Sequence, residues 1–291
     1  MKSIPILCYL RSAVFCLVLG LVPSVRAAET ALEVIPLGAG LHMIQGSGGN
    51  VVSFNGRDGI VLIDTQYAKT APLLAETVAR LADNGPWRFV INTHFHGDHV
   101  GGNAYFAQKA PIIAHRAVRQ FLAARDTQPQ ALPQLTFEDG LQLDINGETL
   151  QLQHYPPGHT NSDAIVWLHK NNVVHVGDLF FNGRFPFIDL DNGGDVRGYV
   201  ANVEAILRVL PEDIVIVPGH GPKAARADYV RFRNLLVDSV SWAEAQIAAG
   251  RNAEAALEQP LPASWEGQSW EFISNERWVE ILLRGLAPPA D

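Results

Sequence analysis

Residues 93–99 read T-H-F-H-G-D-H and follow directly on the apolar run 88–92 (RFVIN). The residues of metal-ligand type in this stretch are His94, His96, Asp98 and His99. Side chains alternate along an extended chain, so the first two histidines point to one side, and Gly97 permits a sharp turn that brings the last two ligands round. Imidazole and carboxylate groups suit zinc. Three unrelated polar histidines at a strand end are the alternative, but this density of ligand types favours a metal site.

Three later segments also end an apolar strand with a ligand-type residue in a glycine-containing turn. They are P-G-H-T at 157–160, V-G-D at 176–178 and P-G-H-G at 218–221, and they supply His159, Asp178 and His220. Each segment alone is weak evidence, because a histidine beside a glycine is more often a polar turn residue. Together with residues 93–99 they predict one site fed by the ends of several strands.

Strand-rich and helical stretches occur twice along the chain, in similar order. Apolar strand-like runs flank the turn signals Asn55-Gly56 and Asp58-Gly59 in the first half and Asn146-Gly147 in the second. The spacing of apolar residues predicts helices over residues 69–82, 101–108, 116–124, 195–210 and 225–249. Two sheets enclosed by helices, an α/β fold with αββα four-layer packing, follow from this pattern.

The first 27 residues have the features of a secretory signal peptide. Lys2 and Arg11 precede the apolar run 12–22, and the stretch ends in P-S-V-R-A, which predicts cleavage after Ala27. An uncleaved membrane anchor is the alternative, but the run is shorter than the roughly 20 residues that a membrane span needs. The sequence therefore predicts a periplasmic or secreted protein with no membrane association after cleavage.

Cleavage would remove both cysteines, Cys8 and Cys16, so the mature chain would have neither a disulfide nor a thiolate ligand. It would keep 19 basic and 30 acidic residues, a net charge of about −11. That charge disfavours nucleic acids and anionic membrane surfaces as partners. We therefore expect a small-molecule substrate, and the sequence leaves the oligomeric state open.

The five motifs, residues 93–99 with V-G-G-N after them, the three later segments and the buried acid Asp64 in I-V-L-I-D-T, resemble the metallo-β-lactamase superfamily. The resemblance covers about residues 33 to 222. It implies the αββα sandwich of that superfamily and a metal-dependent hydrolase. The domain would span residues 28–250, with residues 251–291 as a C-terminal appendage. Asp64 would support the metal loop, although an ordinary strand-end cap would use the same residue.

The resemblance also implies a ligand set. One zinc would be held by His94, His96 and His159, a second by Asp98, His99 and His220, and Asp178 would bridge them; iron or manganese could replace zinc. The pair of metals would activate a water for attack on a carbonyl carbon. Asp98 could also orient that nucleophile, which makes it the candidate catalytic residue.

The ligand set departs from the main β-lactamase subclass, which has a cysteine ligand after the glycine where this chain has Gly177-Asp178. A second lactamase subclass lacks the bridging aspartate. Glyoxalase II-type thioesterases have the bridge but use a basic C-terminal region to bind glutathione, and the acidic tail here has no such cluster. A periplasmic location also argues against a glutathione thioester. An ester, thioester, lactone or amide bond is the expected target, with β-lactams possible substrates.

Residues 177–195 (GDLFFNGRFPFIDLDNGGD) resemble a group of exported hydrolases of the superfamily that is associated with quinoprotein or sulfur-oxidation systems. Arg184 and Phe185 follow a ligand directly and are candidate substrate contacts, an apolar wall with a cation for a carboxylate. Core packing and a solvated arginine are the alternatives. Lys223 could reach a substrate carboxylate or lie free on the surface.

Three alternative functions remain open at this point. They are β-lactamase as the main activity, redox chemistry at a di-iron version of the site, and a non-catalytic metal-binding accessory protein of a periplasmic oxidation system. Iron would favour the oxygen-rich bridge that Asp178 supplies. An accessory protein would be expected to have a broken ligand set, whereas all seven ligand positions are filled here.

Overall fold

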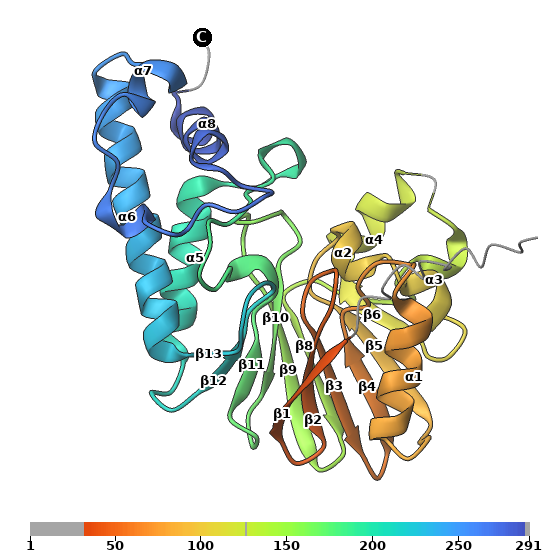
Figure 1. Ribbon diagram of the computed structural model, residues 1–291. Helices are drawn as coiled ribbons and strands as arrows, with labels where there is room; N and C mark the ends of the chain where they lie inside the picture. The colour runs from red at the N-terminus through yellow and green to blue at the C-terminus, as the bar shows by residue number, and fades with distance from the viewer. Residues whose placement is uncertain (1–31, 126, 289–291) are drawn as a thin grey trace, which may run out of the picture. The chain divides into compact units, whose positions relative to one another are not determined.

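Two β-sheets face each other in the computed structural model, which describes residues 32–125 and 127–288 (Figure 1). The predicted signal peptide and both cysteines lie outside the described residues. Helices α1, α3 and α4 lie on the outer side of one sheet and α5 and α6 on the outer side of the other. The predicted αββα four-layer sandwich is therefore confirmed. No helix among the described residues is long and apolar enough to cross a membrane.

The first sheet has seven strands in chain order. They are β1 (Glu33–Gly38), β2 (Leu41–Gln45), β3 (Val51–Gly56), β4 (Gly59–Ile63), β5 (Trp87–Asn92), β6 (Ile112–His115) and β7 (Leu135–Phe137). Tight turns join the antiparallel strands β1 to β4, whereas β4 to β7 are parallel and need crossover helices. Those helices are α1 (Ala71–Leu81), α2 (Gly97–Val100), α3 (Asn103–Phe106) and α4 (Arg116–Ala123).

The second sheet has six strands in the order β13-β12-β11-β10-β9-β8. They are β8 (Gly140–Ile145), β9 (Glu148–His154), β10 (Ala164–Leu168), β11 (Val173–His175), β12 (Val215–Val217) and β13 (Ala224–Ala225). Asn146 and Gly147 both adopt positive φ, 55° and 74°, which is the backbone that a two-residue hairpin turn requires. Only β11 and β12 are parallel, and α5 (Val196–Val209) connects them.

The core between the sheets is built from the inward faces of both. Met43 and Ile91 from the first sheet pack with Leu152 and Val166 from the second, and all four are buried. The outer face of the first sheet packs against α1, whose Leu74 and Val78 lie on one helical face because residues four apart meet there. Apolar side chains thus fill the space between the sheets and cover the α1 side of the first sheet, which favours the strand ends as the place for functional side chains.

The C-terminal residues pack into the core that covers the second sheet. This part contains α6 (Arg226–Ala248), α7 (Ala253–Leu257) and α8 (Asn275–Leu286). Trp265 and Trp278 are buried there, and their indole N–H groups both donate to Oγ of Ser239, at 2.8 and 3.2 Å. The sequence pattern predicted α6 but neither α7 nor α8, and the boundary at residue 250 stays a prediction.

Candidate metal centre

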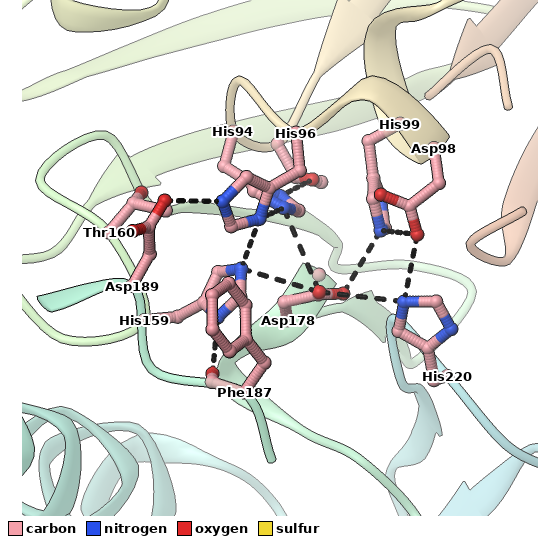
Figure 2. A network of polar contacts seen from close by, with 12 residues as sticks. His94, His96, Asp98, His99, His159, Thr160, Asp178, Phe187, Asp189 and His220 are labelled. Atoms are coloured by element: carbon pink, nitrogen blue, oxygen red, sulfur yellow. Dashed lines mark hydrogen bonds and ion pairs between the residues drawn. The ribbon is translucent and has the colours of Figure 1, made fainter. Parts of the chain in front are cut away.

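The seven predicted ligands meet at one edge of the two sheets (Figure 2). They come from the loop after β5, the loop between β9 and β10, the turn after β11 and the turn after β12. Their ligand atoms form two groups, each within 4.8 Å: His94, His96, His159 and Asp178 in the first, and Asp98, His99 and His220 in the second. The division is the one that the resemblance implied, although metal binding itself stays a prediction.

Three imidazole nitrogens of the first group face one another. Nδ1 of His96 lies 3.1 Å from Nε2 of His94 and 2.8 Å from Nε2 of His159. The opposite nitrogen of each ring is held from behind. Nδ1 of His94 is 3.0 Å from Oγ1 of Thr93, Nε2 of His96 is 2.9 Å from Oδ2 of Asp189, and Nδ1 of His159 is 2.7 Å from the carbonyl of Phe187. Those partners can accept the proton of each ring. The three facing nitrogens are then unprotonated, and their lone pairs point toward one another.

The second group is arranged in the same way. Oδ2 of Asp98 lies 3.1 Å from Nε2 of His220 and 3.6 Å from Nε2 of His99. Nδ1 of His99 is 2.8 Å from Oδ2 of Asp64, which holds the ring so that Nε2 faces the site. Gly49 lies against this ring, and a Cβ there would come within 2.2 Å of it.

Asp178 stands between the two groups. Its Oδ2 is 3.3 Å from Nε2 of His159 and 3.5 Å from Nε2 of His220, while its Oδ1 is 3.1 Å from Nε2 of His99. Gly219 leaves room for this carboxylate, since a Cβ there would lie 1.9 Å from Oδ1. One carboxylate therefore faces both ligand groups.

Nε2 of His99 and Oδ1 of Asp178 are both buried, and although they lie 3.1 Å apart, neither has a hydrogen bond of normal geometry. Buried polar groups are normally satisfied, so two such atoms facing one centre indicate a place suited to bind a ligand. Five imidazoles and two carboxylates are the donors that zinc takes. The residues present therefore fit a pair of metal ions.

Comparison with known proteins gives the family. A model of the metallo-beta-lactamase superfamily matches residues 44–220, which include all seven candidate ligands. The chain belongs to the metallo-β-lactamase superfamily. Its described residues accordingly share the fold of a metallo-beta-lactamase from Pontibacter korlensis, with a TM-score of 0.62 at 21% identity over 71% of this chain and 99% of that one.

Two curated relatives in the superfamily are similar over part of their length. "Metallo-beta-lactamase type 2" of Bacteroides fragilis is 27% identical over 131 residues, which cover 45% of this chain and 52% of that protein. "Hydroxyacylglutathione hydrolase" of a Polaromonas species is 33% identical over 135 residues, 45% of this chain and 47% of the relative. The chain thus spans about half the length of the curated relatives it matches.

The charges of this superfamily site are strongly coupled. Burial lowers the pKa of His159 to about 3, and it holds that of His94 well below the usual value. Burial alone would lower the pKa of His220, but Asp178 and Asp98 outweigh it and raise the pKa to about 9. Burial opposes ionisation of Asp98 too, yet the neighbouring His99 and His220 lower its pKa to about 2. The carboxylates of the site are therefore ionised. Their negative charge is balanced either by protons on neighbouring histidines or by bound metal ions.

Asp64 lies behind the loop that carries the candidate ligands His94 to His99, and its role in supporting a metal stays a prediction. It is fully buried, and it accepts hydrogen bonds from the backbone N–H and the hydroxyl of Thr93, both at 2.8 Å. Its φ of 65° is in the left-handed region, which costs a non-glycine residue about 1–3 kcal/mol. Its bonds to Thr93 and His99 hold it in that conformation.

Three of the candidate ligands reach the surface. The side chains of His96, Asp98 and His220 are 17%, 20% and 16% exposed, whereas those of His94, His99 and His159 are at most 1% exposed. A substrate must therefore approach from the side of the exposed three, which we call the opening.

One predicted substrate contact is wrong. Phe185 is fully buried and packs against Trp265 and Trp278, with ring centroids 5.4 and 5.5 Å away, so it belongs to the core. Arg184 is half-buried, with its guanidinium 5.0 Å from the Trp270 ring, and Lys223 is exposed. Substrate contact by either of these two stays a prediction.

The residues that hold the ligands were not predicted from the sequence. Thr93, Asp189 and the carbonyl of Phe187 each support one histidine, and His175 lies behind Asp64 with its Nε2 3.5 Å from Oδ2. Thr93 adjoins a ligand and could have been suspected. Asp189 is 93 residues from its partner His96, and no local pattern marks it.

Proposed function

We propose that this chain is an exported hydrolase that holds two zinc ions and cleaves an ester, thioester, lactone or amide bond, with β-lactams among its possible substrates. The observation that carries the proposal is Asp178, whose two oxygens face the two ligand groups. A carboxylate in that position suits a pair of metal ions better than a single one. The similarity to a lactamase and to a hydroxyacylglutathione hydrolase supports hydrolysis at a carbonyl carbon.

The position of each residue indicates which ion it would hold. His94, His96 and His159 would hold one ion, Asp98, His99 and His220 the other, and Asp178 both. Zinc ions in such a pair lower the pKa of water and polarise a carbonyl oxygen. Asp98 is ionised at neutral pH and lies at the opening, so its carboxylate can accept a hydrogen bond from the attacking water and orient it.

Elemental analysis of the purified mature protein tests the proposal. We expect about two zinc ions per chain and loss of hydrolysis on chelation, since the ions supply the water activation. The double variant His96→Ala/His159→Ala should lose the metal of the first group and all hydrolysis. His169→Ala is the matched control, because that histidine is exposed on the second sheet and contacts Gln151. Hydrolysis at the normal rate by the double variant would refute the proposal.

A substrate screen separates β-lactamase from the other activities. The zinc-loaded protein is assayed against nitrocefin, carbapenems, lactones and thioesters. Turnover of a carbapenem at about 1–1000 per second would make lactamase the main activity. Preference for a lactone or thioester would leave β-lactams as minor substrates.

The two remaining alternatives predict different observations. A di-iron redox protein would be coloured and would contain iron, whereas zinc gives a colourless protein. A non-catalytic accessory protein would bind metal and hydrolyse nothing in the screen. The complete set of candidate ligands favours a catalytic protein over the accessory protein.

Export is tested by N-terminal sequencing of the protein from a periplasmic fraction. We expect the mature chain to begin at Ala28. A mature protein that still carries residues 1–27 would argue for a membrane anchor instead.

A further inference from the structure

Three aromatic side chains line one side of the opening, and we call Phe187, Trp270 and Phe272 the aromatic wall. The Phe187 ring lies 5.7 Å from the ring of His96, and the Trp270 ring lies 6.2 Å from that of His220. Phe272 joins the other two, with ring centroids 5.4 Å from Phe187 and 5.6 Å from Trp270. The wall therefore borders both of the exposed histidines.

Hydrogen bonds position Trp270, which comes with Phe272 from the C-terminal part of the chain. The indole N–H of Trp270 donates to the carbonyl of Phe185 at 2.9 Å, and the backbone N–H of Phe185 donates to Gln268 at 2.8 Å. The backbone N–H of Trp270 also donates to Ile273 at 3.0 Å. Phe187 and Trp270 are half-buried, but Phe272 is 45% exposed. An aromatic side chain kept this exposed beside a reaction centre is suited to bind an apolar group.

Two arginines pack against the rings of the aromatic wall. The guanidinium of Arg184 lies 5.0 Å from the Trp270 ring, and that of Arg277 lies 4.1 Å from the Phe272 ring and 5.4 Å from the Phe187 ring. Arg277 also donates to the carbonyl of Phe272 at 2.8 Å, which orients it.

Within residues 32–125 and 127–288, no carboxylate lies within 4.0 Å of either guanidinium, although this chain is rich in acids. The nearby Asp191 is paired with Arg284, and Asp189 holds His96. Both arginines thus keep donors for an anion from outside.

We propose that the aromatic wall and its two arginines select the substrate: an anionic molecule whose apolar ring lies on Phe272 and Trp270 and whose carboxylate binds Arg184 or Arg277. The proposal rests on the proposed function for the bond that is cleaved, but not for the binding itself. Planar guanidinium groups bind carboxylates through two parallel hydrogen bonds, and stacking on an aromatic ring leaves the edge of the guanidinium free to do so. The C-terminal segment then belongs to the site as well as to the core.

Binding of 2-naphthoate and of its neutral counterpart 2-naphthamide to the zinc-loaded full chain tests this selection by calorimetry. We expect naphthoate to bind about tenfold or more tightly than naphthamide, because only the acid can pair with an arginine. Arg184→Gln/Arg277→Gln should remove that preference and leave naphthamide binding unchanged. Arg184→Gln/Arg277→Lys keeps one cation on the wall and should restore part of the preference. Trp270→Ala should weaken the binding of both ligands.

The controls remove the same groups elsewhere. Arg57→Gln removes a charge at the β3–β4 turn, where the side chain is 96% exposed, and Trp167→Ala removes an indole from strand β10, where it stacks on His169. Neither should alter the preference. Equal binding of the two ligands would overturn the proposal. So would a preference that survives Arg184→Gln/Arg277→Gln, because zinc itself would then hold the carboxylate. The experiment measures binding and not turnover. A protein without hydrolase activity can therefore still show the preference for naphthoate, and an active hydrolase can lack it, so the two proposals are tested separately.

Discussion

At the scale of single residues, the site depends on which ring nitrogen of each histidine is free. The hydroxyl of Thr93 donates a hydrogen bond to Asp64 and can accept one from Nδ1 of His94, so the three side chains form a chain of hydrogen bonds behind the first ligand group. Asp189 holds Nε2 of His96 in the same way, through a negatively charged carboxylate. Partners of this kind set the tautomer and the basicity of a metal-binding imidazole.

Asp189→Asn tests the support of His96. An amide can present its NH₂ to Nε2 and favour the wrong tautomer, so we expect zinc affinity to fall about 10–100-fold. Competition with a fluorescent chelator measures the affinity. Asp191→Asn is the control, since Asp191 lies in the same loop but pairs with Arg284 on the surface. Equal affinities for the two variants would show that Asp189 does not position the ligand.

Gly219→Ala tests the place of Asp178. The added methyl would lie 1.9 Å from Oδ1, so the carboxylate must move away from His99. We expect fewer than two zinc ions per chain by elemental analysis and a large loss of hydrolysis. Gly97→Ala is the control, because a Cβ there meets nothing within 4 Å and Gly97 does not adopt the positive φ that a turn dependent on glycine would need. Two zinc ions and full activity in Gly219→Ala would contradict a bridging role.

At the scale of the elements, two stacked histidines join the two sheets. His115 ends β6 and His154 ends β9, and their rings lie 3.7 Å apart with 5° between the planes. Burial lowers the pKa of His115 to about 4, and the nearby His154 and Arg116 act in the same direction. The contact is therefore formed by neutral rings.

The stack makes stability depend on pH. The folded-state pKa of His115 lies below the unfolded value of 6.5, so its contribution is complete above pH 6.5 and is lost as the pH falls towards 4. Between pH 6.5 and 4 we expect the free energy of unfolding, measured with urea, to fall by about 1 kcal/mol more in the native chain than in His115→Asn. Asparagine is chosen because it can still cap α4. His169→Asn is the control on the second sheet. Parallel curves for the native chain and His115→Asn would exclude this effect.

Much of the element pattern could be predicted from the sequence, since strand alternation and helical spacing are local. Residues 88–92 form β5, and the helix predicted over 195–210 is α5. The short strands β7 and β13 were missed because two or three residues show no period, and their pairing partners decide their structure. Helix α8 was not predicted, although its Val279 and Leu282 are buried on one helical face.

At the scale of the whole molecule, the C-terminal residues complete both the core and the site. Trp278 is fully buried against Phe185, which follows the candidate ligand Asp178 along the chain, and Trp270 borders His220. Loss of this part would expose the apolar face of α5 and α6.

Trp278→Ala tests the dependence of the fold on this packing. We expect the free energy of unfolding to fall by about 3–5 kcal/mol, because a large buried side chain is removed and leaves a cavity. Denaturant titration measures it. Trp167→Ala is the control, since that indole is only half-buried, and it should cost less. A small effect of Trp278→Ala would support residues 251–291 as an appendage that the rest of the fold does not need.

The sequence by itself determined the family and the candidate ligands. Both follow from short-range features: histidines spaced along one strand end, glycines in the turns, and apolar periods of two and 3.6 residues. The tertiary structure alone decided that Phe185 is in the core, that Asp189 holds His96 from 93 residues away, and that Trp270 stands beside His220. These placements depend on how distant segments pack, and packing between segments far apart in the chain leaves no regular spacing in the sequence.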